Sequence, residues 1–520
     1  MSTTFNRTRE ALKPPRLVVA ALTLLMASAS PALHAAEAPG RPEHKEHTGE
    51  LDRRLEIALR KAGFTGKIEA SLEARLGRPI DSRLADLGRK LFFDPLGGLH
   101  NDNTCAGCHA PSAGFGDTQS IAIGIQSNRV VGPGRAGPRN QRRTPTVVNT
   151  AFYPALMWNG RFSAPTGNPF DNAMGFTFPA PEGTTKFPPN DPVVRHLLIA
   201  QAHIPPTELN EAAGFTGTKG TLGPRFDIFD DGLGGVVPMP DASGFRNDPI
   251  RAAVAQRLNG TPAYVRLFSD VFPVVRGGEP ITPLMFAQAI AEFEFTLVRA
   301  NAPIDRFARG QRGAMGASEK RGALLFFGKA NCVACHAVAG ASNEMFSDFK
   351  NRTVGVPQIA PFFGPGKGNT IFDGVGEDED FGLEQVTGHA GDRYKFRTSP
   401  LRNVILQPTF FHNGAFTRLD DAIRHHLDVL DSTRNYSARK AGVARDLRSR
   451  QGPTAPVLQA LDPLLAVPVR LDDGELDDLT RFVGLSLLDP RARPQALCRL
   501  VPETLPSGLA PLDFQGCGRH

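Results

Sequence analysis

The chain has 520 residues, enough for three or four domains of ordinary size or for two domains with large insertions. Its formal net charge is +6, but residues 1–36 contribute four basic groups and one acidic group, which leaves the remainder near +3. So small a charge on so long a chain argues against a nucleic-acid-binding protein. The many Gly (53) and Pro (44) residues predict long loops.

Residues 1–36 have the pattern of a secretory signal peptide. A basic segment precedes an apolar run over residues 17–27, and small residues follow, with cleavage expected after Ala35 or Ala36. An uncleaved anchor is the alternative, although the apolar run is short for a membrane span. We therefore expect export to the periplasm, with residues 37–80 forming a polar leader and a first helix.

Apolar residues recur with helical spacing in several segments, and no segment shows the sustained alternation of a strand. The predicted helices cover roughly residues 51–91, 193–202, 249–258, 282–299, 318–327, 419–430 and 472–488. Stretches rich in Gly, Pro or acidic residues are predicted to be loops, namely 119–143, 162–192, 214–247 and 364–392. The predicted fold class is mainly α with long loop insertions.

A five-residue motif occurs twice, as Cys105-Ala106-Gly107-Cys108-His109 and as Cys332-Val333-Ala334-Cys335-His336. This pattern is the attachment signature of a c-type haem, in which each thiol forms a thioether to a vinyl group and the histidine ligates the iron. A disulfide loop or a zinc half-site is the alternative. However, a histidine follows each pair, and no second CxxC pair completes a zinc set. We expect two covalently bound haems, one in each half of the chain.

The two motifs divide the chain into two haem-bearing halves, an internal repeat at domain scale. We predict an N-terminal haem domain over residues 81–305 and a C-terminal haem domain over residues 306–490, with a hinge near the start of the second. The two remaining cysteines, Cys498 and Cys517, lie in a tail over residues 491–520. In an oxidising compartment they are expected to form a structural disulfide.

Ordered motifs around the haem sites resemble those of the bacterial di-haem cytochrome c peroxidases, a family that includes the di-haem enzymes that mature methylamine dehydrogenase. The resemblance runs from about Leu84 to Leu488. It rests on the segments LFFDP, TPTVVN, MWNGR, FGKANCVACH, SPLRNVILQPTFFHNG and LDDAIRHH. The fold it implies is two cytochrome-c-like helical domains whose haems face a common interface.

The resemblance implies different tasks for the two irons. His109 is implied as the proximal ligand of the peroxide-binding iron, and His336 as that of the iron that relays electrons. Peroxide chemistry needs an open iron and a nearby base that moves a proton between the two oxygens. In the family this base is a glutamate ten residues after a glutamine, a spacing that Gln201 and Glu211 share here. Glu211 is the expected acid/base and Gln201 an orienting group, with Glu208 as the alternative base.

Two further residues follow from the resemblance. Trp158, the only tryptophan of the chain, matches the family's inter-haem tryptophan, where an indole can shorten an electron path; a large core side chain is the alternative. The relay iron often carries methionine as its sixth ligand, and His426 stands at the matching place. His425, a tyrosine-like arrangement or a vacant position are the alternatives. Imidazole in place of thioether should lower the reduction potential. His412 is expected to pack near the relay haem.

The sequence departs from the family at two other places. Many family peroxidases block the peroxide iron with a histidine after the first haem, but residues 121–127 contain none, so the first iron is expected to be open. The family often holds calcium between its domains. Here Arg143, Gln407 and Thr409 replace the usual Asn, Thr and Pro, which argues against calcium.

The leading hypothesis is a periplasmic peroxidase that reduces hydrogen peroxide with electrons from a small donor protein, a cytochrome c or a cupredoxin. One alternative is an oxidase that modifies residues of a partner protein through high-valent iron, with residues 162–192 and 214–247 as a docking surface. Another is a non-catalytic di-haem electron carrier. A homodimer is compatible with the resemblance, because family members are often dimers.

Overall fold

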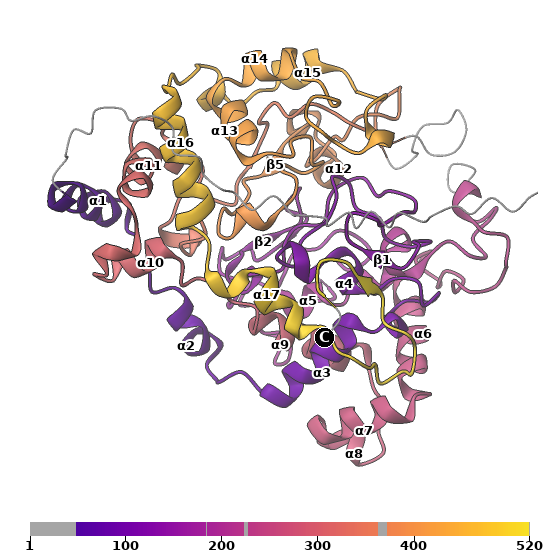
Figure 1. Cartoon of the computed structure of the whole chain (residues 1–520). Coiled ribbons are helices and arrows are strands. Elements are labelled where there is room, and N and C mark those ends of the chain that lie inside the picture. Colours follow the sequence, from indigo (N-terminus) through magenta and orange to yellow (C-terminus); the bar gives the residue numbers. More distant parts are fainter. Residues whose placement is uncertain (1–47, 184, 223–226, 362–371, 519–520) are drawn as a thin grey trace, which may run out of the picture. The chain divides into compact units, whose positions relative to one another are not determined.

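The computed structural model describes residues 48–183, 185–222, 227–361 and 372–518 (Figure 1). The predicted signal peptide and the first part of the predicted leader lie outside these residues. Within the described ranges, no helix combines the length and the apolar character needed to cross a membrane.

The described part of the chain is mainly helical, as predicted. Its α-helices are α1 (Thr48–Ala62), α2 (Leu72–Leu76), α3 (Ser82–Phe93), α4 (Cys105–Cys108), α5 (Leu197–Gln201), α6 (Asn247–Asn259), α7 (Pro262–Val271), α8 (Pro273–Arg276), α9 (Pro283–Phe295), α10 (Pro303–Ala308), α11 (Ala317–Phe327), α12 (Glu384–Thr387), α13 (Leu419–Leu427), α14 (Val429–Arg434), α15 (Thr454–Gln459), α16 (Asp473–Arg481) and α17 (Pro494–Leu497). Short 3-10 and π turns join many of them.

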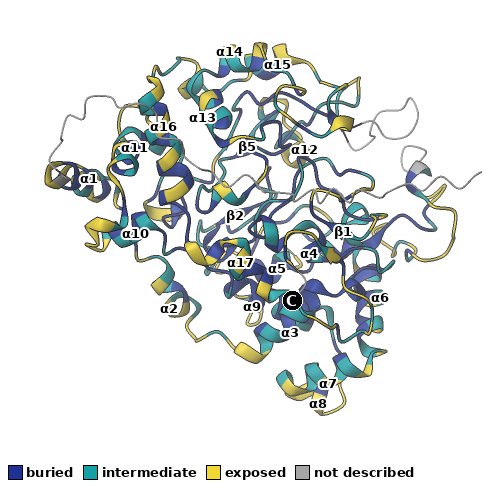
Figure 2. Ribbon diagram, viewed as in Figure 1, coloured by how far each residue is buried: buried dark blue, intermediate teal, exposed yellow. Residues whose placement is uncertain are grey.

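The described strands are only two residues long and form three separate pairs. They are β1 (Val130–Val131), β2 (Ala155–Leu156), β3 (Phe162–Ser163), β4 (Asn351–Arg352), β5 (Phe396–Arg397) and β6 (Asp513–Phe514). β1 pairs in parallel with β6, whereas β2 with β3 and β4 with β5 are antiparallel. The buried residues concentrate around α4, α5 and α9, while outer helices such as α8 and α14 show exposed faces (Figure 2).

Two of the predicted helices differ most in extent from those observed. The helical pattern over residues 51–91 is divided among α1, α2 and α3, because Gly63 and Gly77 adopt left-handed backbone (φ +74° and +70°) that ends α1 and α2. The helix predicted over residues 193–202 is confirmed only as α5. The sequence analysis missed α7 and α8, each of which begins with a proline at its first position.

Each half of the chain contains the same crossing of two helices next to its haem motif. In the first half α3 crosses α9, and a methyl group on Gly88 would collide with the main-chain oxygen of Ala289. In the second half α11 crosses α16, and a methyl group on Gly322 would collide with the main-chain oxygen of Asp478. Glycine at both crossings lets the helix backbones touch.

The same repeat governs the aromatic packing at these crossings. Four residues after each glycine stands a phenylalanine, Phe92 or Phe326, which leads the chain toward the following CxxCH motif. Phe92 packs on Phe293 of α9, with 5.2 Å between ring centroids, and Phe326 packs on Phe482 with 5.3 Å. The two haem motifs are therefore delivered by equivalent helix pairs.

The predicted disulfide between Cys498 and Cys517 is confirmed, and it closes the C-terminal tail into a loop. This tail packs on the first half of the chain rather than on the second (Figure 1). Phe514 of β6 contacts Phe93 with 5.5 Å between ring centroids, and the Ser507 hydroxyl donates a hydrogen bond to the Asp94 carboxylate at 2.7 Å.

Replacement of Gly322 by Ala should lower the free energy of unfolding by about 1–3 kcal/mol or more, because the added methyl group forces α11 away from α16. The measurement is the denaturant midpoint of the variant against the unmodified protein. Gly313→Ala is the matched control, since nothing lies within 4 Å of a methyl group there. Equal midpoints for the two variants would show that the crossing is not tightly packed.

Candidate di-haem site

Both haem motifs open onto one cavity of about 490 Å³ between the two halves of the described chain. Its walls include the two cysteines and the histidine of each motif. The same walls carry every other residue that the sequence predicted for the site: Gln201, Glu208, Glu211, Trp158, His412 and His426. Residues separated by more than 300 positions in the chain are thus brought to one space.

The four motif cysteines are free thiols, so neither motif forms a disulfide loop. Burial, followed by the charge of Glu294, raises the pKa of Cys105 to about 12, and burial raises the pKa of Cys108 to about 11. The described residues contain no group of three His, Cys, Asp or Glu side chains arranged to hold a metal ion by themselves. Two thiols and one imidazole on the wall of a cavity fit a covalently attached haem.

The two motif histidines are aimed into the cavity by the same device. The Nδ1 atom of His109 bonds to the carbonyl oxygen of Phe115 at 3.3 Å, and that of His336 bonds to the carbonyl oxygen of Phe346 at 2.9 Å. Both phenylalanines have positive φ (+54° and +56°), an unusual backbone that turns each carbonyl toward its ring. Nε2 of each histidine remains for a metal. Burial lowers the pKa of both imidazoles to about 4, which keeps them neutral.

His426 of α13 lies opposite His336 across the cavity, with 6.2 Å between the ring centroids. Two metal–nitrogen bonds of about 2 Å, together with the distance from each nitrogen to its ring centre, span roughly 6 Å. The Nδ1 atom of His426 bonds to the carbonyl oxygen of Ala422 at 2.9 Å, so its Nε2 is the free nitrogen. The pair therefore has the spacing for one metal between two imidazoles.

The alternative ligand, His425, has no free nitrogen. Its Nδ1 lies 3.0 Å from the hydroxyl of Ser432, and its Nε2 lies 2.8 Å from the carbonyl oxygen of Val354. The ring is fully buried and packs against Phe416. Of the two adjacent histidines, only His426 faces the haem motif.

The first haem motif faces a carboxyl group instead of an imidazole. Glu211 lies on a π-helical turn, Leu209–Ala213, that lines the cavity. Burial, and then the negative charge of Glu208, raises the pKa of the Glu211 carboxyl to about 7, while Arg161 opposes this rise. Glu208 itself forms an ion pair with Arg161 at 3.1 Å. A carboxyl that exchanges its proton near neutral pH is suited to acid/base catalysis.

Residues 121–127, where the family's blocking histidine is expected, pack against the segment that carries Glu211. The amide of Ile125 donates to the carbonyl oxygen of Asn210 at 3.4 Å. A methyl group on Gly124 would collide with the same oxygen, so this loop and the π-helical turn are in backbone contact. The side chain of Ile125 packs with Phe215 and Phe229 of the insertion. Residues 121–127 contain no histidine that could reach the iron site beside His109.

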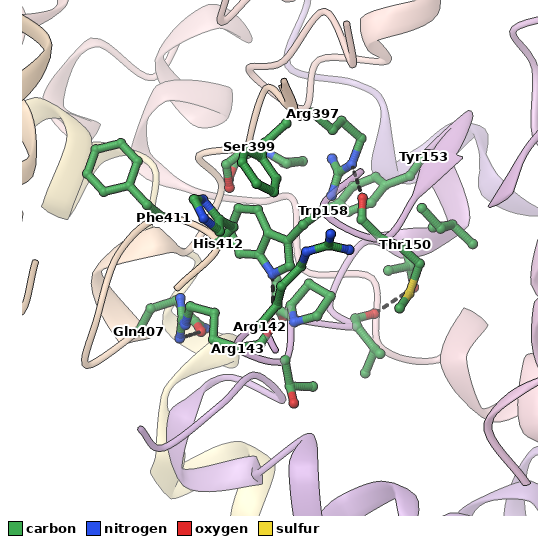
Figure 3. Close-up of a pocket in the computed structure, with 18 of the residues that line it drawn as sticks. Arg142, Arg143, Thr150, Tyr153, Trp158, Arg397, Ser399, Gln407, Phe411 and His412 are labelled. Atoms are coloured by element: carbon green, nitrogen blue, oxygen red, sulfur yellow. Dashed lines mark hydrogen bonds between the residues drawn. The ribbon is translucent and has the colours of Figure 1, made fainter. Parts of the chain in front are cut away.

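Trp158 is buried at the centre of the cavity wall and is held by both halves of the chain (Figure 3). Its indole N–H donates to the carbonyl oxygen of Arg143 at 2.8 Å, and its own carbonyl accepts from the amide of Arg397 at 2.6 Å. The Arg143 amide in turn donates to the carbonyl oxygen of His412 at 2.8 Å. Hydrogen bonds thus connect the first half, the indole and the second half.

The residues at the family's calcium positions bond to the protein itself. The Arg143 guanidinium donates to the Oε1 atom of Gln407 at 2.8 Å, and the Thr409 hydroxyl donates to the carbonyl oxygen of Gln119 at 3.2 Å. These side chains therefore bond within the protein, and the expectation of no calcium stays a prediction.

One cavity residue was missed by the sequence analysis. Glu294 is buried on α9, and burial raises the pKa of its carboxyl to about 8. Its only polar contact among the described residues is a long one, 3.4 Å, from the Thr150 hydroxyl. The sequence signal for Glu294 was an acidic residue on the apolar face of the helix predicted over residues 282–299.

Comparison with known proteins agrees with these features. A family model described as di-haem cytochrome c peroxidase matches residues 82–313. The methylamine utilization protein MauG of Methylorubrum extorquens is 28% identical over 368 residues, which cover 69% of this chain and 75% of that protein. The cytochrome c551 peroxidase of Pseudomonas aeruginosa is 26% identical over 347 residues, covering 67% and 72% respectively.

Solved structures share the fold. The diheme peroxidase BthA from Burkholderia thailandensis aligns with a TM-score of 0.50 at 19% identity, covering 79% of this chain and 87% of that one. A MauG-like protein associated with microbial copper homeostasis aligns with a TM-score of 0.50 at 19% identity, covering 80% and 91%.

The fold and the paired haem motifs define an oxidoreductase built for two c-type haems. Residues 82–313 match the di-haem cytochrome c peroxidase family, and the relatives similar to the chain include both peroxidases and MauG proteins.

Replacement of His426 by Gly should abolish the low-spin spectrum of one haem, because the imidazole opposite His336 is removed. Optical and EPR spectra of the oxidised protein measure this change. His425→Gln is the matched control and should leave the low-spin signal in place, since both nitrogens of His425 bond to the protein. A low-spin signal that survives in His426→Gly would remove His426 as a ligand.

Proposed function

We propose that the chain is a periplasmic peroxidase that reduces hydrogen peroxide to water with electrons from a small donor protein. One observation carries the proposal: the two haem motifs face different groups. His336 faces an imidazole at metal-bridging distance. Burial, and to a smaller extent the charge of Glu211, raises the pKa of the two thiols of the first motif, and Gln201 lines the same cavity. One site is suited to electron relay and the other to binding a small oxidant.

When bound, the two haems would supply redox-active irons and Lewis-acid chemistry at the first site. The chain supplies the proton chemistry. The Glu211 carboxylate can take a proton from one oxygen of peroxide and return it to the other oxygen, which leaves as water. Two electrons and two protons complete the reduction of one peroxide to two waters. Gln201 at the end of α5 provides an amide that can orient the bound peroxide.

Trp158 supplies a covalent and hydrogen-bonded route for these electrons. Its contacts run from the segment beside the first motif, through Arg143, to the segment beside the second, through Arg397. His426 and His336 would keep the relay site closed to peroxide. Export to the periplasm is supported by the disulfide in the tail and by covalent haem motifs, both of which suit an oxidising compartment.

Replacement of Glu211 by Gln should lower the second-order rate of reaction with peroxide by about 10²–10⁴-fold, because the amide cannot move the proton. The deprotonated carboxyl is the active form, so the rate of the unmodified protein should rise with pH through about 7 and fall below it. Stopped-flow mixing with peroxide across this range measures both effects.

Glu208→Gln is the control. It removes the like charge that raises the pKa of Glu211 and frees Arg161, so activity should persist and the pH profile should move to lower pH. An unchanged rate in Glu211→Gln would exclude Glu211 as the base.

An oxidase that acts on a partner protein is the second candidate. The observation in its favour is the insertion over residues 214–247, which exposes large apolar side chains: Leu233 is 80% exposed and Met239 is 67% exposed. Turnover of peroxide with a reduced small cytochrome supports the peroxidase. Slow turnover, combined with a long-lived oxidised state of both haems after peroxide, supports the oxidase. Two six-coordinate haems that do not react with peroxide would leave only an electron carrier.

A further inference from the structure

The segments that hold Trp158 are copies of one another in the two halves of the chain. Arg143 and Arg397 each stand six residues before an asparagine, Asn149 and Asn403 respectively, and each is followed by threonine. Both asparagines adopt left-handed backbone (φ +70° and +61°), and both donate their side-chain amide to the carbonyl oxygen of Arg299, at 3.1 and 3.0 Å. The two arginines therefore occupy equivalent positions.

Each copy lies beside one haem motif. Burial lowers the pKa of His109, and the backbone of Pro145, two residues after Arg143, partly opposes this. Burial likewise lowers the pKa of His336, and the backbone of Ser399, two residues after Arg397, partly opposes this. The repeat thus assigns one arginine to each haem site.

These two arginines differ in charge pairing from the other arginines of the cavity. Among the described residues, six arginines line it, and four form ion pairs there: Arg142 with Asp380 (2.7 Å), Arg161 with Glu208 (3.1 Å), Arg352 with Asp348 (2.6 Å) and Arg402 with Asp305 (2.7 Å). Neither Arg143 nor Arg397 takes part in any ion pair formed by described residues.

Arg397 is buried and bonds only to neutral groups. Its Nε atom donates to the carbonyl oxygen of Met157 at 3.0 Å, and its guanidinium lies 5.8 and 5.5 Å from the ring centroids of Tyr153 and Phe349. Burial lowers the pKa of Arg397 to about 10. None of these groups carries a negative charge that would neutralise the guanidinium.

Arg143 is buried in the same manner. Its side chain donates to the neutral amide oxygen of Gln407, and its Nε atom is buried without a partner in the described structure. Burial lowers the pKa of Arg143 to about 10, and the charge of Asp117 partly opposes this, but the two form no ion pair among the described residues. The Asp117 carboxylate accepts from the amides of Gln119 and Thr144, both at 2.9 Å.

A buried cation without an ion pair is costly, so an anion is expected beside it. Each haem carries two propionate carboxylates, and guanidinium groups bind carboxylates through paired N–H donors. We propose that Arg143 and Arg397 bind haem propionates, Arg143 at the first haem and Arg397 at the second. This inference rests on the two haems of the proposed function, but not on reaction with peroxide.

The binding has an electrostatic consequence. A cation near the iron favours the reduced state, and it also keeps the propionate ionised. Its removal should therefore lower the midpoint potential of that haem. The propionate would then gain a proton on reduction, so the potential should become dependent on pH near neutrality.

The experiment compares Arg143→Gln and Arg397→Gln with the unmodified holoprotein. Spectroelectrochemical titration at several pH values gives the two potentials, and resonance Raman spectra give the propionate bending bands. We expect Arg397→Gln to lower the potential of the low-spin haem and to shift its band, and Arg143→Gln to do the same at the high-spin haem. The double variant Arg142→Gln/Asp380→Asn is the matched control, because it removes a cavity arginine without changing net charge, and it should leave both potentials in place.

The lysine variants Arg143→Lys and Arg397→Lys guard against misfolding. Lysine keeps the charge but loses the paired donors, so the potentials should stay near those of the unmodified protein while the propionate bands shift. Unchanged bands in the lysine variants would overturn the proposal. It would also fall if both glutamine variants matched the control double variant in potential and in its dependence on pH. Because no peroxide is present, these results stay separate from the outcome with Glu211→Gln.

Discussion

The hydrogen bond between each motif histidine and a phenylalanine carbonyl determines how the rest of the site is used. Without it, either imidazole could rotate and present the wrong nitrogen to the cavity. The acceptor is placed by a left-handed phenylalanine in both halves, six residues after His109 and ten residues after His336. The strained backbone of Phe115 and Phe346 is stabilised by burial, since both side chains lie in the aromatic clusters beside their motifs.

Duplication accounts for what the two sites share, and elements outside the duplication account for their difference. The glycine crossings, the phenylalanine that follows each glycine, the left-handed asparagines and the arginines occur once in each half. His426 comes from α13, and Glu211 comes from a π-helical turn next to an insertion. The chain thus holds two similar cofactor positions on a common plan and gives them unlike surroundings.

The sequence predicted those features that depend on local spacing. The CxxCH motifs, the tail cysteines and the helical class follow from residue types and intervals, and the disulfide was confirmed. The interval between Gln201 and Glu211 suggested a shared site, and both residues line the cavity. His426 and His425 could not be distinguished from the sequence. The choice depends on contacts of His425 with Ser432 and Val354, which lie outside the helix that carries both histidines.

Other features were beyond a reading of the sequence for physical reasons. Positive φ at phenylalanine contradicts its intrinsic preference, and no local pattern signals it. Among the described residues no carboxylate pairs with Arg397, in a cavity where Arg402 is paired with Asp305, and this is visible only when the neighbours are placed. Burial is likewise the largest cause of the raised pKa of Glu294 and of Glu211, and burial depends on packing that the local sequence does not give.

The two ends of the described chain are exchanged between its halves. Leu55 and Leu59 of α1 belong to the hydrophobic core around α11, and Asp52 forms a buried ion pair with Lys320 at 2.6 Å. The tail at the other end covers α3 through Phe514 and Ser507. Each half is therefore covered by a segment from the opposite end of the described chain. If the chain were cut between the halves, each fragment would lose a segment that packs on it and keep one that packs on the other fragment. We therefore expect that neither half folds stably by itself.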